Sequence, residues 1–162
     1  MVSIYMSKSL LKYKNYDVHS VTTAHGKHLN ANIVTWLMQV AMGGKMLCVA
    51  LYKIDYTIEL VRESRLLNIN ILAKEQTNLI AKLGRKSGRD SDKFRNLKYD
   101  LDDRGIPFLT EAIGYIQCKV LHSTDSGDHE IFVCEVLKQV ILNSEKEVMT
   151  HHFLREKGLV RG

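Results

Sequence analysis

Four segments of this 162-residue chain carry side chains suited to ligand chemistry. The segment 30–36, Asn-Ala-Asn-Ile-Val-Thr-Trp, combines two amides, a hydroxyl and the only tryptophan. Later segments supply a hydroxyl at Thr57, a cation at Lys93 and an imidazole at His129. Amides hydrogen-bond the edge of a ring, an aromatic side chain packs on its face, and hydroxyls and cations hold a phosphate. This set suits a flat aromatic ligand with a phosphate tail.

The side chains of the first two segments also have purely structural interpretations. Asn30 and Asn32 suit a turn before a strand, because asparagine tolerates left-handed backbone. Trp36 fits a hydrophobic core as well as a ligand wall. Thr57 suits the N-cap of a helix, a position compatible with ligand binding because the free amides of a helix N-terminus attract anions.

The other two segments allow two interpretations as well. The mixed polar run 86–94, which contains Ser87 and Lys93, suits a tight pocket for one phosphate, or it is a solvated surface loop. Gly127-Asp128-His129 suits a hairpin turn with an exposed imidazole, or a turn in which the aspartate orients the histidine toward a ring.

Alternation of apolar and polar residues predicts the elements that position these groups. We expect a mainly β protein, an antiparallel barrel of about six to seven strands with short peripheral helices. The interior of so small a barrel is filled by side chains, so a ligand would lie on its outer wall or at a subunit interface. We predict strands at 18–23, 33–42, 46–52 (buried on both faces), 66–72, 113–121 and 130–142, helices at 57–64 and 75–84, and a turn at Pro107.

Composition limits the class of protein. Hydrophobic residues make up 45% and charged residues 25% of the chain, as in a soluble globular protein, and its length predicts a single domain over 1–162. No apolar run approaches the roughly 20 residues that span a bilayer. Residues 1–8 lack the order of a secretion signal, so we expect a cytoplasmic protein.

The sequence offers little support for metal chemistry. Cys48, Cys118 and Cys134 are widely spaced without a Cys-x-x-Cys pair, and we interpret them as buried small hydrophobes. His151 and His152 are adjacent, and on a strand they would point opposite ways. Phosphate-loop, dinucleotide-fold and Gly-x-Ser-x-Gly patterns are absent from the sequence.

A net charge of +5 raises the alternative of a nucleic-acid-binding β-barrel. The basic residues are scattered, however, and a groove for a polyanion would need a denser stripe with aromatic residues between the charges. We therefore expect neither a nucleic acid nor a membrane as partner.

In order and spacing, the motifs resemble the flavin reductase-like family, the flavoredoxin branch of the FMN-binding split barrels. The resemblance covers about residues 17–140. One departure lies at residues 42–45, Met-Gly-Gly-Lys, where members of the family usually carry an Asp/Asn-Pro-Pro turn. The matching motifs are Asn30 to Trp36, Tyr56-Thr57 followed by a helix and Ser64, Leu67 to Asn70, Ser87-Gly88 with Asp92-Lys93-Phe94, Gly105-Ile106-Pro107, and Gly127-Asp128-His129.

The resemblance implies a Greek-key FMN-binding split barrel that forms a homodimer with FMN at the interface. FAD would be a possible substitute for FMN. It further implies electron transfer from NADH or NADPH to the flavin and on to a partner protein or a ferric acceptor, as in a flavin reductase. The alternative is an electron carrier of the flavoredoxin type, which does not oxidise NAD(P)H directly.

The resemblance also assigns roles to residues. His129 would be the catalytic residue, beside the reactive ring and without transferring a proton, because hydride transfer needs mainly the alignment of two rings. The cofactor-binding residues would be Asn30, Asn32, Thr35, Trp36, Thr57, Ser87, Lys93 and His129.

Overall fold

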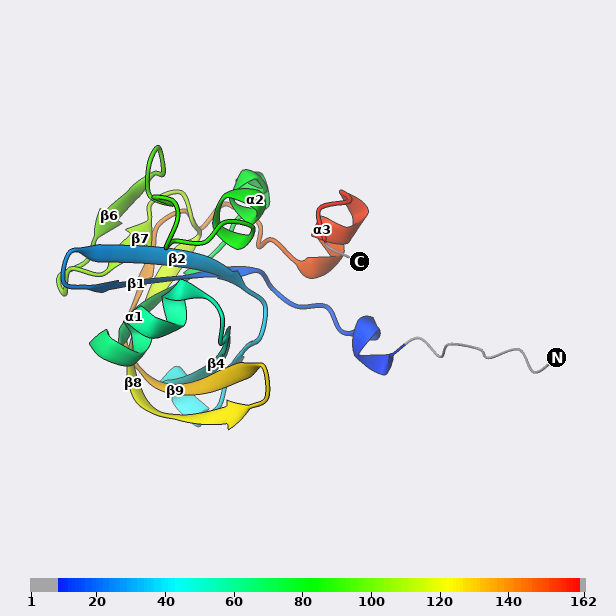
Figure 1. Ribbon diagram of the computed structural model, residues 1–162. Coiled ribbons are helices and arrows are strands. Elements are labelled where there is room, and N and C mark those ends of the chain that lie inside the picture. The colour runs from blue at the N-terminus through cyan, green and yellow to red at the C-terminus, as the bar shows by residue number, and fades with distance from the viewer. Residues whose placement is uncertain (1–8, 161–162) are drawn as a thin grey trace.

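The computed structural model describes residues 9–160 (Figure 1). The expectation about a secretion signal concerns residues 1–8, which lie outside the described part. Nine strands and three α-helices fall within the described residues, together with short 3-10 turns. The strands are β1 (His19–His25), β2 (His28–Val34), β3 (Leu37–Gln39), β4 (Met46–Tyr52), β5 (Leu66–Ile71), β6 (Tyr99–Leu101), β7 (Pro107–Leu109), β8 (Gly114–Ser126) and β9 (His129–Ile141). The helices are α1 (Tyr56–Ser64), α2 (Asn78–Gly84) and α3 (His151–Glu156), and the 3-10 turns are η1 (Leu10–Tyr13), η2 (Met42–Gly44) and η3 (Lys74–Gln76).

Seven strands form one antiparallel sheet in the order β2-β1-β5-β8-β9-β4-β3, and β6 pairs with β7 in a separate hairpin. The two edge strands, β2 and β3, are separated by only Thr35 and Trp36, so Val34 and Leu37 lie within roughly 11 Å of each other. The sheet must therefore curl back toward its own first strand. The backbone N–H of Ala50 in β4 donates to the carbonyl of Trp36 (3.0 Å) at this junction. The predicted mainly β split barrel with short peripheral helices is confirmed.

Two hydrophobic clusters hold the molecule together. The first fills the concave side of the sheet and includes Val21, Leu51 and Phe132, with Ile58 and Val61 of α1 packed into it. The second lies on the other face of β1, β2 and β5 and is covered by α2, α3 and β7; its members include Val18, Ala31, Leu83, Leu109 and Leu154. Within residues 9–160 no helix is long and apolar enough to cross a membrane.

Several local predictions need correction. The strand expected at 33–42 is interrupted, because β2 ends at Val34 and β3 spans only three residues before η2. Residues 46–52 alternate between buried and partly exposed positions instead of being buried on both faces. The helix expected at 75–84 is a 3-10 turn followed by α2. Pro107 is the first residue of β7, where it needs no backbone donor.

The two histidines near the C-terminus were also placed wrongly. His151 and His152 begin α3 instead of lying on a strand.

The three cysteines are free, with Cys118 and Cys134 buried and Cys48 partly buried. Burial raises the pKa of the Cys134 thiol to about 12, which keeps it protonated at neutral pH.

Candidate functional site

Strand β2 is the platform of the candidate site. Asn30 and Asn32 lie within this strand, paired with Thr23 and Val21 of β1, and they are 1% and 3% exposed. The prediction that the two asparagines frame a turn is therefore wrong. The pairing with β1 and the cover of α1 bury side chains whose polarity alone suggested a loop.

Helix α1 and its N-cap residue supply partners for both amides. Asn30 Nδ2 donates to Thr57 Oγ1 (2.9 Å), and Asn32 Nδ2 donates to Asp55 Oδ2 (3.2 Å). Thr57 is fully buried in the first turn, and the residue at the N-cap is Asp55. The N-cap prediction for Thr57 is thus wrong, and its hydroxyl is instead directed onto β2.

The carbonyl oxygens of both amides lack partners. Among the described residues, four buried side-chain polar atoms have no hydrogen bond, and two of them are Asn30 Oδ1 and Asn32 Oδ1. A third, His19 Nδ1, belongs to the residue of β1 that pairs with Val34 of β2, so it lies on the same face of the sheet. An unsatisfied buried acceptor costs on the order of 1–3 kcal/mol, so this face of β2 suits a ligand that brings its own N–H donors.

A small cavity of about 140 Å³ opens beside Asn32. The ring of His129 lies 4.8 Å from that of Trp36 and 5.1 Å from that of Tyr52, centroid to centroid. Trp36 is 52% exposed, so it forms an open wall and not part of the core. Thr35 completes this side of the cavity.

The turn between β8 and β9 orients His129. Gly127 has a φ of 86°, which a residue with a side chain rarely adopts. Asp128 Oδ1 then lies 2.7 Å from His129 Nδ1, and this hydrogen bond lowers the pKa of the Asp128 carboxyl. The imidazole is held by its Nδ1 edge with its ring against the two aromatic side chains.

The loop 85–92 passes directly over Asn30. A Cβ on Gly88 would lie 2.1 Å from Asn30 Oδ1, so only glycine allows this approach. Ser87 stabilises the loop itself, since its hydroxyl accepts from the backbone N–H of Arg89 (3.2 Å) and its carbonyl accepts from Ser91 Oγ (2.9 Å).

Lys93 is buried at the free edge of β2. Its ammonium donates to the carbonyls of Ala31 (2.7 Å) and Leu83 (2.8 Å), so two of its three N–H donors are used by the protein. Burial lowers the pKa of Lys93, and the nearby carboxylate of Asp55 partly offsets this effect.

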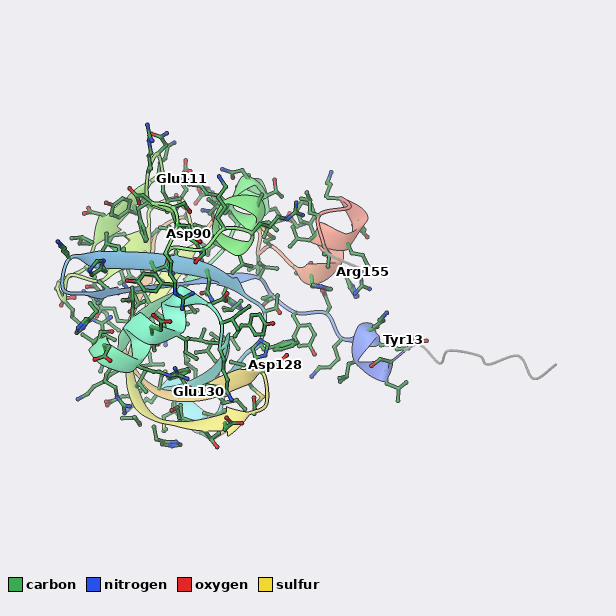
Figure 2. All side chains as sticks on the ribbon, in the orientation of Figure 1. Tyr13, Asp90, Glu111, Asp128, Glu130 and Arg155 are labelled. Carbon is green, nitrogen blue, oxygen red and sulfur yellow. The ribbon has the colours of Figure 1, made fainter. Side chains whose placement is uncertain are left out.

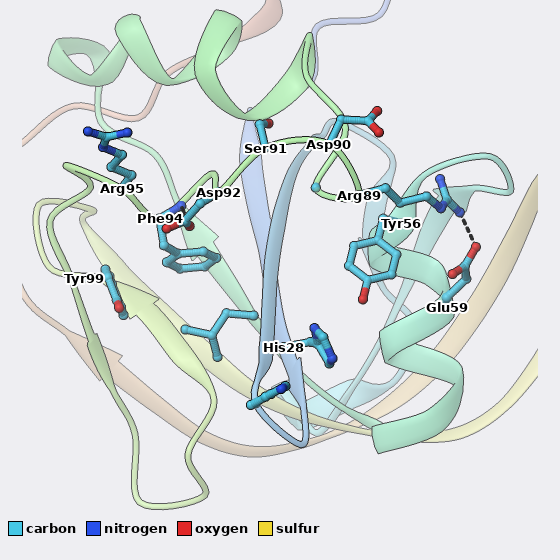
Figure 3. A pocket seen from close by; sticks show the side chains of 13 residues that line it. His28, Tyr56, Glu59, Arg89, Asp90, Ser91, Asp92, Phe94, Arg95 and Tyr99 are labelled. Carbon is cyan, nitrogen blue, oxygen red and sulfur yellow. Dashed lines mark hydrogen bonds and ion pairs between the residues drawn. The ribbon is translucent and has the colours of Figure 1, made fainter.

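A larger open cavity of about 980 Å³ lies between the loop 85–92, the N-terminal half of α1 and the β1–β2 hairpin (Figure 3). Arg89 crosses it, pairs with Glu59, donates to the carbonyl of Ile54 (3.1 Å) and lies 5.4 Å from the centre of the Tyr56 ring. The arginine thereby fastens the loop to α1.

The structure divides the eight sequence-predicted residues into two groups. Four line the small cavity, and the other four lie beneath or within the loop 85–92. The first group is Asn32, Thr35, Trp36 and His129; the second is Asn30, Thr57, Ser87 and Lys93.

Sequence reasoning missed five neighbours of the site. Asp55 had a usable signal, because an aspartate two residues before a helical threonine is a good N-cap. Arg89 and Glu59 are ordinary surface residues until the loop folds onto α1, and Tyr52 and His19 sit in strands like core residues. No local pattern marks these last four residues.

The fold and the site define an antiparallel half-barrel with a partly open, aromatic-lined cavity. Residues 14–157 match the family described as flavin reductase like domain, and the chain belongs to this family. The predicted family is thereby confirmed.

Known proteins with related sequences share this region. The high molecular weight rubredoxin of Moorella thermoacetica is 27% identical over 153 residues, which cover 93% of this chain and 66% of that protein. The ferric-chelate reductase (NAD(P)H) of Archaeoglobus fulgidus is 26% identical over 148 residues, which cover 89% of this chain and 87% of that protein. The crystal structure of an FMN-binding protein from Thermus thermophilus matches with a TM-score of 0.78 at 21% identity, covering 89% of this chain and 82% of that one. This last likeness establishes the fold.

Proposed function

We propose that the protein binds FMN noncovalently and carries electrons from NAD(P)H through the flavin to an acceptor. One observation carries the proposal: two buried amide oxygens without partners lie side by side on β2, next to an aromatic-lined cavity, in a chain of the flavin reductase like family. The pyrimidine edge of a flavin has both donors and acceptors, so it complements a row of amides. FAD carries the same ring and is the alternative cofactor.

We assign the ring to the small cavity. Asn30 and Asn32 would hydrogen-bond the pyrimidine edge, and Thr35 and Trp36 would form the wall beside it. His129 would contact the reactive part of the ring and position the nicotinamide without exchanging a proton. Flavin supplies a ring that accepts hydride and passes electrons on, while the chain supplies alignment and exclusion of water.

We assign the phosphate to the other three residues of the second group, Thr57, Ser87 and Lys93. The first turn of α1 carries backbone N–H groups without helical partners, and Thr57 lies there. Lys93 retains one N–H donor, and Ser87 lies in the loop above. Because Gly88 covers Asn30, entry of the flavin requires the loop 85–92 to move away from β2.

We also propose a homodimer. A cavity of about 140 Å³ is smaller than the roughly 300–1,000 Å³ of typical ligand sites, so one protomer encloses only an edge of the ring. A second copy would cover the remainder. The acceptor is proposed to be a protein or a ferric complex, in keeping with the name of the Archaeoglobus relative.

Two measurements test the proposal. Titration of the purified protein with FMN should give saturable binding, weakened by Asn32→Leu and unaffected by Asn78→Ala, an exposed amide on α2. Anaerobic addition of NADH or NADPH should then bleach the flavin. Failure to bind FMN would refute the proposal, and binding without bleaching by either nucleotide would leave the electron carrier as the function.

A further inference from the structure

A second cavity, of about 830 Å³, adjoins the candidate site at Trp36. Its walls come from the N-terminal segment 9–16, from α3 and from the link between β2 and β3. Thr35 and Trp36 line both this cavity and the smaller one beside Asn32, so the two cavities share a wall. We call the larger one the α3 cavity.

Contacts between distant parts of the chain build the α3 cavity. The backbone N–H of His151 donates to the carbonyl of Tyr16 (2.7 Å), and that of His152 donates to Asn15 Oδ1 (3.0 Å). Figure 2 shows Arg155 on α3 and Tyr13 on η1 at the same end of the molecule. The cavity thus depends on folded structure and not on a single flexible segment.

The lining of the α3 cavity is positively charged. It includes Lys12, Lys14 and Arg155 and contains no aspartate or glutamate. Within residues 9–160, none of these three side chains forms a salt bridge. Three cationic side chains without carboxylate partners favour an anion.

The two histidines add to this charge pattern. Arg155 Nη2 lies 3.2 Å from His151 Nδ1, and because arginine only donates, Nδ1 accepts and the proton of the neutral ring lies on Nε2. Burial, and then the neighbouring Arg155 and His152 side chains, lower the pKa of His151. The neutral imidazole of His151 can therefore donate a hydrogen bond to an anion from Nε2–H without first gaining a proton.

Aromatic rings are the other component of the lining. Tyr13, Tyr16 and Trp36 contribute faces or edges, and Tyr13 and Trp36 are 75% and 52% exposed. Lys14 Nζ lies 5.3 Å from the centre of the Tyr16 ring, which holds a charge beside an aromatic surface. Cations interleaved with aromatic side chains recognise a phosphate attached to a flat base.

We infer that the α3 cavity binds the phosphate-bearing adenosine half of a nucleotide. Its volume lies within the usual range for a small-molecule site, and its charge complements a pyrophosphate. The identity of the nucleotide rests on the proposed function: it is the electron donor NAD(P)H, whose nicotinamide half passes Trp36 to reach the cavity beside Asn32 and His129.

The test uses ADP as the probe, because ADP carries the adenosine and phosphates without a redox ring. Trp36 is the only tryptophan of the chain and lines the α3 cavity, so its fluorescence reports binding directly. With the protein as purified, ADP should change this fluorescence saturably, and calorimetry on FMN-loaded protein should give the same affinity. Adenosine, which lacks the phosphates, should bind at least about tenfold more weakly.

Variants locate the binding. The double change Lys12→Ala/Lys14→Ala, and separately Arg155→Gln, should each weaken ADP binding about tenfold or more. Lys157→Ala is the matched control, since Lys157 follows α3 but does not line the cavity, its ammonium lying 5.8 Å from the centre of the Phe153 ring. Circular dichroism verifies that each variant is folded.

The outcomes separate this inference from the proposed function. Absence of ADP binding in a protein that binds FMN would overturn the inference alone, as would equal binding of adenosine or equal loss in Lys157→Ala. ADP binding in a protein that never binds FMN would support the cavity and refute the proposed function. Loss of a dimer in Arg155→Gln, with ADP inert in the parent protein, would assign the cavity to a second copy and overturn the inference.

Discussion

Two pairs of asparagines occupy equivalent patterns on the two strands that flank β1. Asn30 and Asn32 lie on β2, and Asn68 and Asn70 lie on β5. All four are at most 3% exposed, and each pair follows the i, i+2 spacing that places side chains on one face of a strand. The difference between the pairs is whether the protein itself satisfies their hydrogen bonds.

The pair on β5 is fully satisfied. Asn70 Nδ2 donates to the carbonyl of Ser20 (3.0 Å) and to Thr22 Oγ1 (2.9 Å), while its oxygen accepts from the backbone N–H of Leu109 (2.8 Å). Asn68 likewise uses both its amide nitrogen and its oxygen in the β6–β7 hairpin and the loop within it. These amides fix the hairpin on the outer face of the sheet.

The pair on β2 is only half satisfied. Each amide nitrogen donates to α1 or to its N-cap residue Asp55, and each oxygen has no partner in the described chain. A buried asparagine therefore indicates a binding site only when the hydrogen-bond partners of both its nitrogen and its oxygen have been counted. Complete hydrogen bonding indicates a structural role, and an unmet acceptor beside a cavity indicates a ligand.

The largest loss of stability is expected from Asp102→Ala, which removes a hydrogen-bond acceptor of Asn68 on β5. The side chain of Asp102 is fully buried and accepts from Asn68, Gln117, Arg104 and two backbone amides. Its removal leaves the largely buried guanidinium of Arg104 without its counter-ion, so the free energy of unfolding should fall by about 3–5 kcal/mol. Urea denaturation measures the change, and Asp90→Ala, at an exposed position, is the control.

The same carboxylate gives the stability a defined pH dependence. Burial by itself raises the pKa of Asp102, but the hydrogen bonds from Asn68, the amides of Ile106 and Arg104, and the Arg104 guanidinium together lower it. Because the pKa is lower in the folded state, the stabilisation is present above the unfolded pKa near 3.8 and is lost as the pH falls through the folded value. Asp102→Asn should lose less stability than the parent protein as the pH falls from about 5 to about 2, the range that brackets a carboxyl pKa lowered from its ordinary value. An equal loss in both proteins would contradict this prediction.

Asn70→Ala should cost about 2–3 kcal/mol of unfolding free energy. The change leaves the buried N–H of Leu109 without its acceptor, removes the side-chain hydrogen bond to the carbonyl of Ser20 and creates a small cavity. FMN affinity measured at a temperature where the variant is folded should remain that of the parent protein. If Asn70→Ala weakened FMN binding as much as Asn32→Leu is expected to, the pair on β5 would not differ in function from the pair on β2.

Most of the fold follows from local patterns. Alternation predicted strands at 18–23, 66–72 and 130–142, within a few residues of β1, β5 and β9. It succeeds there because the alternation of apolar and polar side chains can be read from neighbouring residues alone. It failed at β2, where polarity at Asn30 and Asn32 predicted a turn. Their burial depends on β1 and α1, which no window of local sequence contains.

The candidate site could be predicted in part. Motif order identified Asn32, Trp36 and His129, which the structure brings around one cavity. The partners of Lys93 could not be foreseen, because the carbonyls of Ala31 and Leu83 come close only when α2 packs beside the free edge of β2. Contacts of this kind depend on tertiary packing, so no regular spacing of residues in the sequence predicts them.

Lys93→Met should lower the free energy of unfolding by about 1–3 kcal/mol. Methionine keeps the unbranched stem but cannot donate to the two buried carbonyls. If Lys93 also contacts the flavin phosphate, FMN affinity should fall by a further tenfold or so. Lys86→Met, an exposed change in the same region, is the control, and a loss of stability without a loss of FMN affinity would make Lys93 purely structural.

The smallest change in stability, and the sharpest test of the comparison, is expected from Asn32→Leu. Leucine has a similar shape and removes an oxygen that already lacks a partner, so the unfolding free energy should change by less than about 1 kcal/mol. The only bond lost is the one to Asp55, a partly exposed carboxylate that water can solvate. FMN affinity should nevertheless fall about 10- to 100-fold, because the ring loses a buried acceptor. A variant that is destabilised as strongly as Asn70→Ala, yet binds FMN normally, would show that both asparagine pairs serve the fold alone.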